Sequence, residues 1–405
     1  MMNQLLFLPE KQRTLCHLLG KNLFGEDFTL EKETDWNGIY EESVRQTVAA
    51  LAFSGYRQLS MDAKLKQSIM ETYNGCLYQY IQNCTYHSYL DYLMKENNLS
   101  YVVLKGVASA LYYPQPELRQ MGDVDFLIEK GDIEKASCVM EKDGFHPWEE
   151  DHICHIVFRK ERMHYEMHFE PAGVPGGAAG EKIRSYLADI QETAREVHDD
   201  AFSYVVPDEF HHGLVQLLHM QHHLLSEGIG LRHLCDWAVF VHSFGKGEFE
   251  KMFREKLEAV GLWQFARIIS LTAHLGLGLP RQNWMGKEKN LAADLLSDIL
   301  CGGNFGNKDD QRIYEGMFIS NRGKDGVRHT RIGQFIRTLN QVVYTHWPVS
   351  RRIRLLLPPG WLFFGIRQII RMATGKRRKV DFLKSYRKSM GRKELYRQLK
   401  LFEMR

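Results

Sequence analysis

The sequence predicts an α+β fold in which a small mixed β-sheet core is flanked by N-terminal and C-terminal helical segments. Two changes in residue pattern support this prediction. Apolar residues at the three- and four-residue spacing of helices give way near residue 99 to alternating, strand-like runs, and the helical spacing returns near residue 208. The length of 405 residues, with 44% hydrophobic and 25% charged residues, fits a globular protein of two or three domains.

These changes divide the chain into four segments: an N-terminal helical segment (1–98), a mixed core (99–207), a helical domain expected to close the cleft (208–346) and a basic C-terminal helical tail (347–405). Apolar spacing, together with breaks at glycine and asparagine, predicts the helices of the first and third segments. They span residues 3–19, 42–59, 61–97, 208–225, 231–244, 249–260, 263–275 and 290–300.

Short strands are expected in the core, because successive side chains of its alternating runs would point to opposite faces. The expected strands cover residues 101–104, 122–128, 153–159, 164–170 and 201–206, with helices at 107–113 and 132–143. Loops rich in glycine are expected at 173–180 and 301–310. Asp132 and Asp208 are the expected N-caps of the helices that follow them.

Charge is distributed unevenly along the chain. The tail from Trp347 onward holds 17 Lys and Arg against 3 Asp and Glu, whereas the remainder holds 36 against 47. The acidic remainder argues against a groove for long nucleic acid on the catalytic core. The tail itself has three interpretations: a packed helix with a basic outer face, a membrane-surface contact through residues 361–379, or a nucleic-acid contact.

Seven cysteines are scattered along the chain without a CxxC pair, which is typical of free thiols in a reducing compartment. The first residues lack a basic region followed by a long apolar run, so no signal peptide is expected. No run of eighteen apolar residues predicts a transmembrane helix. The expected location is cytoplasmic, with peripheral membrane contact as an alternative.

The clearest chemical signal is a pair of carboxylates, Asp123 and Asp125, at the start of an expected strand. Side by side they repel each other and lose hydration, an arrangement that a divalent cation neutralises. On a later expected strand, Glu166, His168 and Glu170 share one face, with Glu166 favoured over Glu170 as a third acidic ligand. If the two strands are neighbours, three acidic groups surround one or two divalent ions.

These residues resemble a known family. The run LKG…LYYP…LRQMGDVDFLI, followed by YEMHFE and LRHLCDW, is similar to the uncharacterised nucleotidyltransferase family of the polymerase-beta-type superfamily, over roughly residues 99–240. That superfamily has a glycine after a strand, a D-x-D pair a dozen or more residues later, and a third carboxylate on a further strand. The resemblance implies transfer of a nucleoside monophosphate from an NTP such as ATP, with Mg²⁺ or Mn²⁺ as the cofactor.

The resemblance also implies roles for individual residues. Asp123, Asp125 and Glu166 would be catalytic and hold the metal, while Lys105 and Arg119 would face the triphosphate. The other residues expected around the nucleotide are Gly106, Ser109, Gly122, His168, Arg232 and Asp236. The family's usual Gly-Ser is here Gly106-Val107, so the nearest hydroxyl is that of Ser109.

A dense set of histidines lies between residues 211 and 223. His219 and His223 are four residues apart on one helical face, but no carboxylate lies at a recognised zinc spacing, so these histidines are interpreted as lining the cleft or packing between helices. Arg232 and Asp236, also four apart, could form an ion pair that helps to build the cleft or is purely structural.

The sequence therefore favours a metal-dependent nucleotidyltransferase that releases pyrophosphate. The unidentified acceptor would be a hydroxyl or phosphate of a small molecule, a glycan-like metabolite or a protein. The alternative is a catalytically silent nucleotide-binding or interaction protein, which could act at the membrane surface in assembly of a surface polymer.

Overall fold

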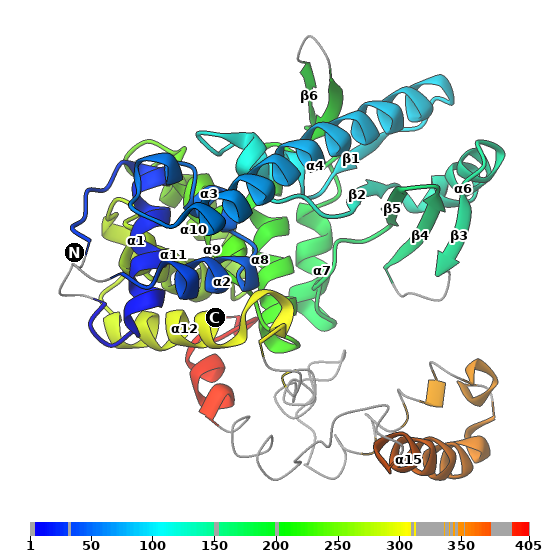
Figure 1. Cartoon of the computed structure of the whole chain (residues 1–405). Helices are drawn as coiled ribbons and strands as arrows, with labels where there is room; N and C mark the ends of the chain where they lie inside the picture. The colour runs from blue at the N-terminus through cyan, green and yellow to red at the C-terminus, as the bar shows by residue number, and fades with distance from the viewer. Residues whose placement is uncertain are drawn as a thin grey trace.

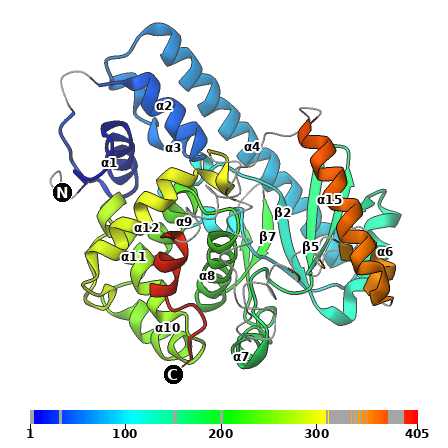
Figure 2. The ribbon, with the colours of Figure 1, turned by 90° about the horizontal axis from the view of Figure 1, so that it is seen from below.

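The protein folds into a helical unit and a sheet-containing unit that lie side by side (Figure 1 and Figure 2). A computed structural model describes residues 5–30, 34–149, 154–198, 202–308, 312, 336, 340, 343, 344, 347–351, 353–373 and 391–404. Parts of several elements expected from the sequence lie outside these residues. They are 3–4, 153, 201 and 374–379, together with most of the interval 309–346, which includes the end of the expected loop at 301–310.

The main sheet has five strands in the order β1-β2-β5-β4-β3, in which β2 and β5 are parallel and the other neighbours are antiparallel. This mixed sheet confirms the predicted α+β fold. Its strands are β1 (Tyr101–Val103), β2 (Val124–Ile128), β3 (His146–Glu149), β4 (His155–Lys160) and β5 (Met163–His168). Strand β3 is not among the expected strands, because its four residues include a proline and give no alternating pattern long enough to detect.

A separate two-stranded sheet pairs β6 (Arg195–His198) with β7 (Ser203–Val206). Three helices belong to the same part of the chain: α5 (Val107–Ala110), α6 (Ile133–Lys142) and α7 (Gly177–Tyr186). The loop expected at 173–180 is wrong from Gly177 onward, because α7 begins there. The burial of Ile183 on α7 outweighs the low helix propensity of its glycines. Gly180 also permits an approach to the Pro175 carbonyl that a Cβ would block.

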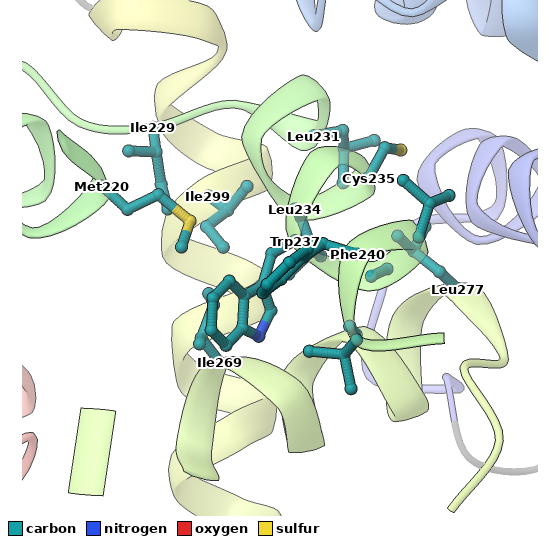
Figure 3. Packing of buried hydrophobic residues seen from close by; sticks show 14 of the residues in the cluster. Met220, Ile229, Leu231, Leu234, Cys235, Trp237, Phe240, Ile269, Leu277 and Ile299 are labelled. Carbon is teal, nitrogen blue, oxygen red and sulfur yellow. The ribbon is translucent and has the colours of Figure 1, made fainter. Parts of the chain in front are cut away.

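The helical unit combines both ends of the chain. Its helices are α1 (Glu10–Phe24), α2 (Trp36–Arg45), α3 (Ala49–Ala52), α8 (Glu209–Leu225), α9 (Leu231–His242), α10 (Glu248–Ala259), α11 (Trp263–Leu277) and α12 (Lys289–Gly302). Helix α1 packs on α11 within one hydrophobic core. Figure 3 shows the centre of this core, where Trp237 lies among aliphatic side chains and donates from its indole Nε1 to Ser270 Oγ at 2.8 Å.

Two of the expected N-terminal helices differ from the structure. The helix expected at 3–19 begins only at Glu10, after Pro9, and runs on to Gly25, whose positive φ of 72° ends it. The single helix expected at 42–59 is broken, because Thr47 has a φ of 57° and the buried Gln46 side chain is drawn into contacts with distant backbone. Apolar spacing alone cannot reveal such tertiary hydrogen bonds.

The 34-residue helix α4 (Ala63–Glu96) joins the two units. Its first half contributes Leu65 and Ile69 to the helical core, and its second half contributes Leu90 and Met94 to the core beneath the sheet. A helix that spans two cores fixes their relative position, so the space between the units has a defined shape.

The described part of the tail contains α15 (Leu357–Ala373) and a helical stretch at 391–398. The second of these packs into the helical unit, where the Tyr396 hydroxyl donates to Asp298 Oδ2 at 2.6 Å and Leu399 is fully buried. Among the described residues, no helix combines the length and the apolarity needed to cross a lipid bilayer.

Candidate active site

The two strands that carry the acidic residues are direct neighbours. In the parallel pair of β2 and β5, Asp125 is the register partner of Glu166. Asp123 lies one residue before the start of β2. The adjacency that a shared metal site requires is therefore present, between residues about forty positions apart in the chain.

A cavity of about 400 Å³ opens beside these carboxylates, between the sheet and the helical unit. Ten of the eleven residues expected around the site line it: Lys105, Gly106, Ser109, Arg119, Gly122, Asp123, Asp125, Glu166, Arg232 and Asp236. The remaining one, His168, is buried behind Asp125. Glu170, the competitor of Glu166, lies outside the cavity lining and forms an ion pair with Arg184 at 2.6 Å.

Asp125 is the most strongly held of the carboxylates. Its Oδ1 lies 2.8 Å from Lys105 Nζ and 3.0 Å from His168 Nε2. Burial opposes ionisation of Asp125, but Lys105 and His168 outweigh it and hold the pKa of this carboxyl well below its usual range. Burial likewise opposes a charge on His168, but Asp125, Cys154 and Glu166 together outweigh it and raise the pKa of the imidazole to about 10.

Asp123 has a different environment. Its side chain is about half exposed, and its Oδ1 lies 2.9 Å from His164 Nδ1. Burial raises the pKa of Asp123 and the nearby Glu166 adds to this effect, although His164 works against it. The two carboxylates of the D-x-D pair therefore differ: Asp125 is fixed by partners, while Asp123 is open to the cavity.

Two sets of side chains at this position have the donor geometry for a metal ion. Asp125, Glu166 and His168 form one set and Asp123, His164 and Glu166 the other, each with ligand atoms within 4.8 Å of one another. Glu166 belongs to both sets. Carboxylate oxygens are the ligands that Mg²⁺ prefers, so the acidic members of these sets fit a hard divalent cation.

The Lys105-Gly106 turn forms the floor of the cavity beside the carboxylates. Gly106 has φ +61° and ψ −115°, a conformation that disfavours a side chain, and it is the N-cap of the short helix α5. Beneath the turn, Asn83 of α4 donates to the Gly122 carbonyl at 2.9 Å, and His87 is buried with neither ring nitrogen hydrogen-bonded. Burial lowers the pKa of His87 to about 3, so it supports the turn as a neutral imidazole.

The Arg119 guanidinium is paired with a carboxylate of the protein itself. Its Nε and one terminal nitrogen each donate to a different oxygen of Asp236 at 2.8 Å, and the Tyr113 hydroxyl donates to the same carboxylate at 2.7 Å. This bidentate pair takes the place of the pairing of Asp236 with Arg232 that the four-residue spacing allowed. It connects the segment before β2 to α9, across the cavity.

Arg232 consequently has no carboxylate partner among the described residues. It donates only a long bond to the Gln120 carbonyl, at 3.4 Å, and its Nε is buried without a hydrogen bond. Burial lowers the pKa of this guanidinium, and Arg119 adds to the effect. A half-buried guanidinium whose Nε is buried and that has no counter-ion is costly, so this position favours an anionic ligand.

Three histidines of α8 and α9, namely His219, His223 and His233, line the wall of the cavity opposite the sheet, which is one of the two interpretations of the histidines at 211–223. His219 and His223 have ring centroids 4.4 Å apart, His233 of α9 lies 5.6 Å from His219, and Phe305 packs edge-on against His223. Burial lowers the pKa values of His219 and His233 well below the usual range, so both are neutral. His211 instead bonds to its own helix cap, Asp208, and packs within the fold.

Several residues in or next to the cavity were not anticipated. Glu227, Asn304 and Phe305 line it, whereas Asn83, His87 and His164 lie beside residues that line it. Only His164 carried a usable signal, because it lies two residues before Glu166 and so shares its strand face. The others reach the site through tertiary packing.

Comparison with known proteins agrees with this geometry. The sequence model of the family described as "Uncharacterised nucleotidyltransferase" matches residues 32–278, which is more than half of the chain. Searches of curated proteins and of solved structures gave no match. The matched region contains β1, β2, β5, α8 and α9, the elements that bring the carboxylates and the cavity wall together, and the chain belongs to the uncharacterised nucleotidyltransferase family.

Proposed function

We propose that this protein is a metal-dependent nucleotidyltransferase that moves a nucleoside monophosphate from an NTP to a hydroxyl or phosphate group of a small molecule, a glycan-like metabolite or a protein. The observation that carries the proposal is the register of Asp125 opposite Glu166 in a parallel strand pair, with Asp123 beside them at the mouth of the cavity. Three carboxylates in one place match the needs of phosphoryl transfer, which depends mainly on positioning and charge stabilisation.

Asp123, Asp125 and Glu166 would hold Mg²⁺ or Mn²⁺. When bound, such an ion neutralises the charge that develops on the phosphate oxygens during in-line displacement. In the balanced reaction, the acceptor oxygen forms a bond to the α-phosphorus, the bond from that phosphorus to the bridging oxygen breaks, and pyrophosphate leaves. The acceptor's proton passes to a carboxylate, for which the partly buried Glu166 is our candidate, and then to water.

The cationic side chains of the cavity would have different roles. Lys105 holds Asp125 in place through its 2.8 Å contact, and the Gly106 turn lets backbone approach the phosphates. Arg232, which lacks a carboxylate partner in the described structure, would bind the triphosphate and later the leaving pyrophosphate. Arg119 and Asp236 would keep the helical wall at the right distance rather than contact substrate.

The test is pyrophosphate release from Mg-NTP with extracts as a source of acceptor, together with mass spectrometry for a product that gains one nucleoside monophosphate. Asp123→Asn and Glu166→Gln should abolish release, while Glu170→Gln, a matched change on the same segment outside the cavity, should leave it intact. Undiminished release by the Asp123 and Glu166 variants would disprove the assignment.

One observation favours a second candidate, a nucleotide-binding protein without turnover. Asp125 Oδ1 already contacts two cationic groups of the protein itself, at 2.8 and 3.0 Å, so these groups could substitute for a metal. In that case an NTP would raise the melting temperature equally with and without Mg²⁺, and no extract would yield pyrophosphate. A stabilisation that requires the divalent ion supports the enzyme.

Membrane contact through 361–379 is a separate proposal. In the described part of that stretch, Leu362, Phe363 and Ile366 of α15 are exposed apolar residues. Truncating the tail would also remove Leu399 from the helical core, so a sharper test replaces these three residues by serine and measures flotation with anionic liposomes. Equal flotation of the variant and the parent would exclude α15 as the contact.

A further inference from the structure

A second group of metal-ligating side chains lies behind the carboxylates. It consists of Cys154, just before β4, His155, the first residue of β4, and His168, the last residue of β5. The antiparallel register of β4 and β5 places His155 directly opposite His168. The Cys154 carbonyl accepts a hydrogen bond from Phe169 N at 3.0 Å, which fixes the cysteine at the same end of the strand pair.

The distances suit a single small ion. One ligand atom from each residue lies within 4.8 Å of the other two, and Cys154 Sγ lies 3.7 Å from His155 Nδ1. For a tetrahedral zinc ion with ordinary Zn–S and Zn–N bonds, the separation between sulfur and nitrogen ligands is about 3.6 Å. The two imidazole rings are 4.9 Å apart between centroids and tilted by 60°, so both can face a common point.

His168 is arranged as metal-binding histidines usually are. Its Nε2 lies 3.0 Å from Asp125 Oδ1, while its Nδ1 is buried and forms no hydrogen bond. A carboxylate on one nitrogen and an ion on the other is the common arrangement in zinc sites, since the carboxylate orients the ring and increases its basicity. An ion would replace the Nδ1 proton, and Nε2–H would continue to donate to Asp125.

We propose that Cys154, His155 and His168 form a binding site for a thiophilic divalent ion, with Zn²⁺ as the ligand of choice, separate from the carboxylate site. A thiolate with two imidazoles selects zinc or cobalt over magnesium, whereas the carboxylates beside the cavity select the reverse. Three protein ligands leave a fourth position for water. Through His168, the ion would hold Asp125 in position for the cavity, but its binding does not depend on nucleotidyl transfer.

The test is a titration of the reduced full chain with Co²⁺ in excess Mg²⁺, which occupies the carboxylate site, followed by absorption spectroscopy. We expect one equivalent of Co²⁺ to produce a sulfur-to-cobalt charge-transfer band that one equivalent of Zn²⁺ removes. Cys154→Ala should abolish the band and weaken Zn²⁺ binding by more than about 100-fold, since removal of a ligand costs more than removal of an outer partner.

Matched variants separate the possible outcomes. Cys138→Ala removes an exposed cysteine on α6 and should leave the band intact, as should Asp123→Asn at the carboxylate site. His155→Ala provides a second ligand variant if Cys154→Ala folds poorly. The absence of cobalt binding, a spectrum without the sulfur band, or a band that persists in Cys154→Ala would each overturn the proposal. None of these results depends on whether pyrophosphate is released.

Discussion

The ion pair between Arg119 and Asp236 gives the most quantitative prediction. The two side chains are 6% and 8% exposed, they form two 2.8 Å bonds, and Asp236 also accepts from Tyr113. Asp236→Asn would leave a buried guanidinium facing a neutral amide. Removing one member of such a pair costs about 3–5 kcal/mol, because the remaining charge is uncompensated.

Thermal unfolding followed by tryptophan fluorescence can measure this loss, because Trp237 is the next residue and is fully buried. For a unit of this size a loss of 3 kcal/mol lowers the melting temperature by about 6–12 °C. The exposed pair of Arg254 and Glu250 on α10 serves as the control, and Glu250→Gln should not shift the transition.

A double variant separates the pair from its individual members. Arg119→Met combined with Asp236→Leu removes both charges and keeps similar volume, so it should recover most of the stability that Asp236→Asn loses. A loss below 1 kcal/mol in Asp236→Asn, or a double variant less stable than both single ones, would refute the reasoning.

The same pair predicts a dependence on pH. Burial raises the pKa of Asp236 but Arg119 outweighs it, so the folded-state pKa lies below the value of about 3.9 in the unfolded chain. The stabilisation is therefore fully present above that value and is lost as the pH falls through the folded pKa. Asp236→Asn should be less sensitive to acid over this range than the parent protein.

Three further changes test other parts of the site. Gly106→Ala should cost about 1–3 kcal/mol, measured by chemical unfolding, because the new Cβ meets only ordinary contacts and the penalty comes from the backbone at φ +61°. Arg232→Gln should weaken Mg-NTP binding, measured by calorimetry, by about 2–4 kcal/mol, or roughly 30- to 1000-fold. The melting temperature of the free protein should not fall, because Arg232 has no counter-ion to lose in the described structure. A destabilised free protein would contradict this reasoning. In a thiol titration of the native protein, only Cys138 and Cys301 should react quickly, because the other five cysteines are buried. Burial also raises the pKa of the Cys16 thiol to about 12. A third fast-reacting thiol would contradict the packing.

The acidic strand pair could be predicted because its information is local. Alternation placed Asp123 and Asp125 at one strand and Glu166 on another, and both strands exist with Asp125 and Glu166 in register. What the pattern could not provide was the pairing itself, since strand order depends on long-range contacts. Strand β3 and helix α7 were missed for a related reason: their stability comes from neighbours rather than from their own residue pattern.

The partners of the charged residues were the least predictable feature. Spacing on one helix allowed a pair between Arg232 and Asp236, but Arg119 binds Asp236 from a segment more than a hundred residues earlier. A four-residue helical pair is worth only a few tenths of a kcal/mol, so a buried bidentate contact with good geometry outweighs it. Asn83 and His87 were missed similarly, because they lie on α4, a helix that was predicted from its apolar spacing alone.

The resulting charge balance supports the proposal that the cavity binds a metal-bound nucleotide. Lys105 is neutralised by Asp125, and Arg119 by Asp236. At the sheet, Asp123 and Glu166 are left with imidazoles as their only partners among the described residues, so negative charge is in excess there. At the helical wall, Glu227 pairs with His223, but Arg232 has no carboxylate within reach in the described structure, so positive charge is uncompensated at that one position. A divalent cation would compensate the first imbalance and a polyphosphate the second, and a metal–nucleotide complex presents both charges together. Either component alone would leave one end of the cavity uncompensated, so we expect the ion and the nucleotide to bind cooperatively.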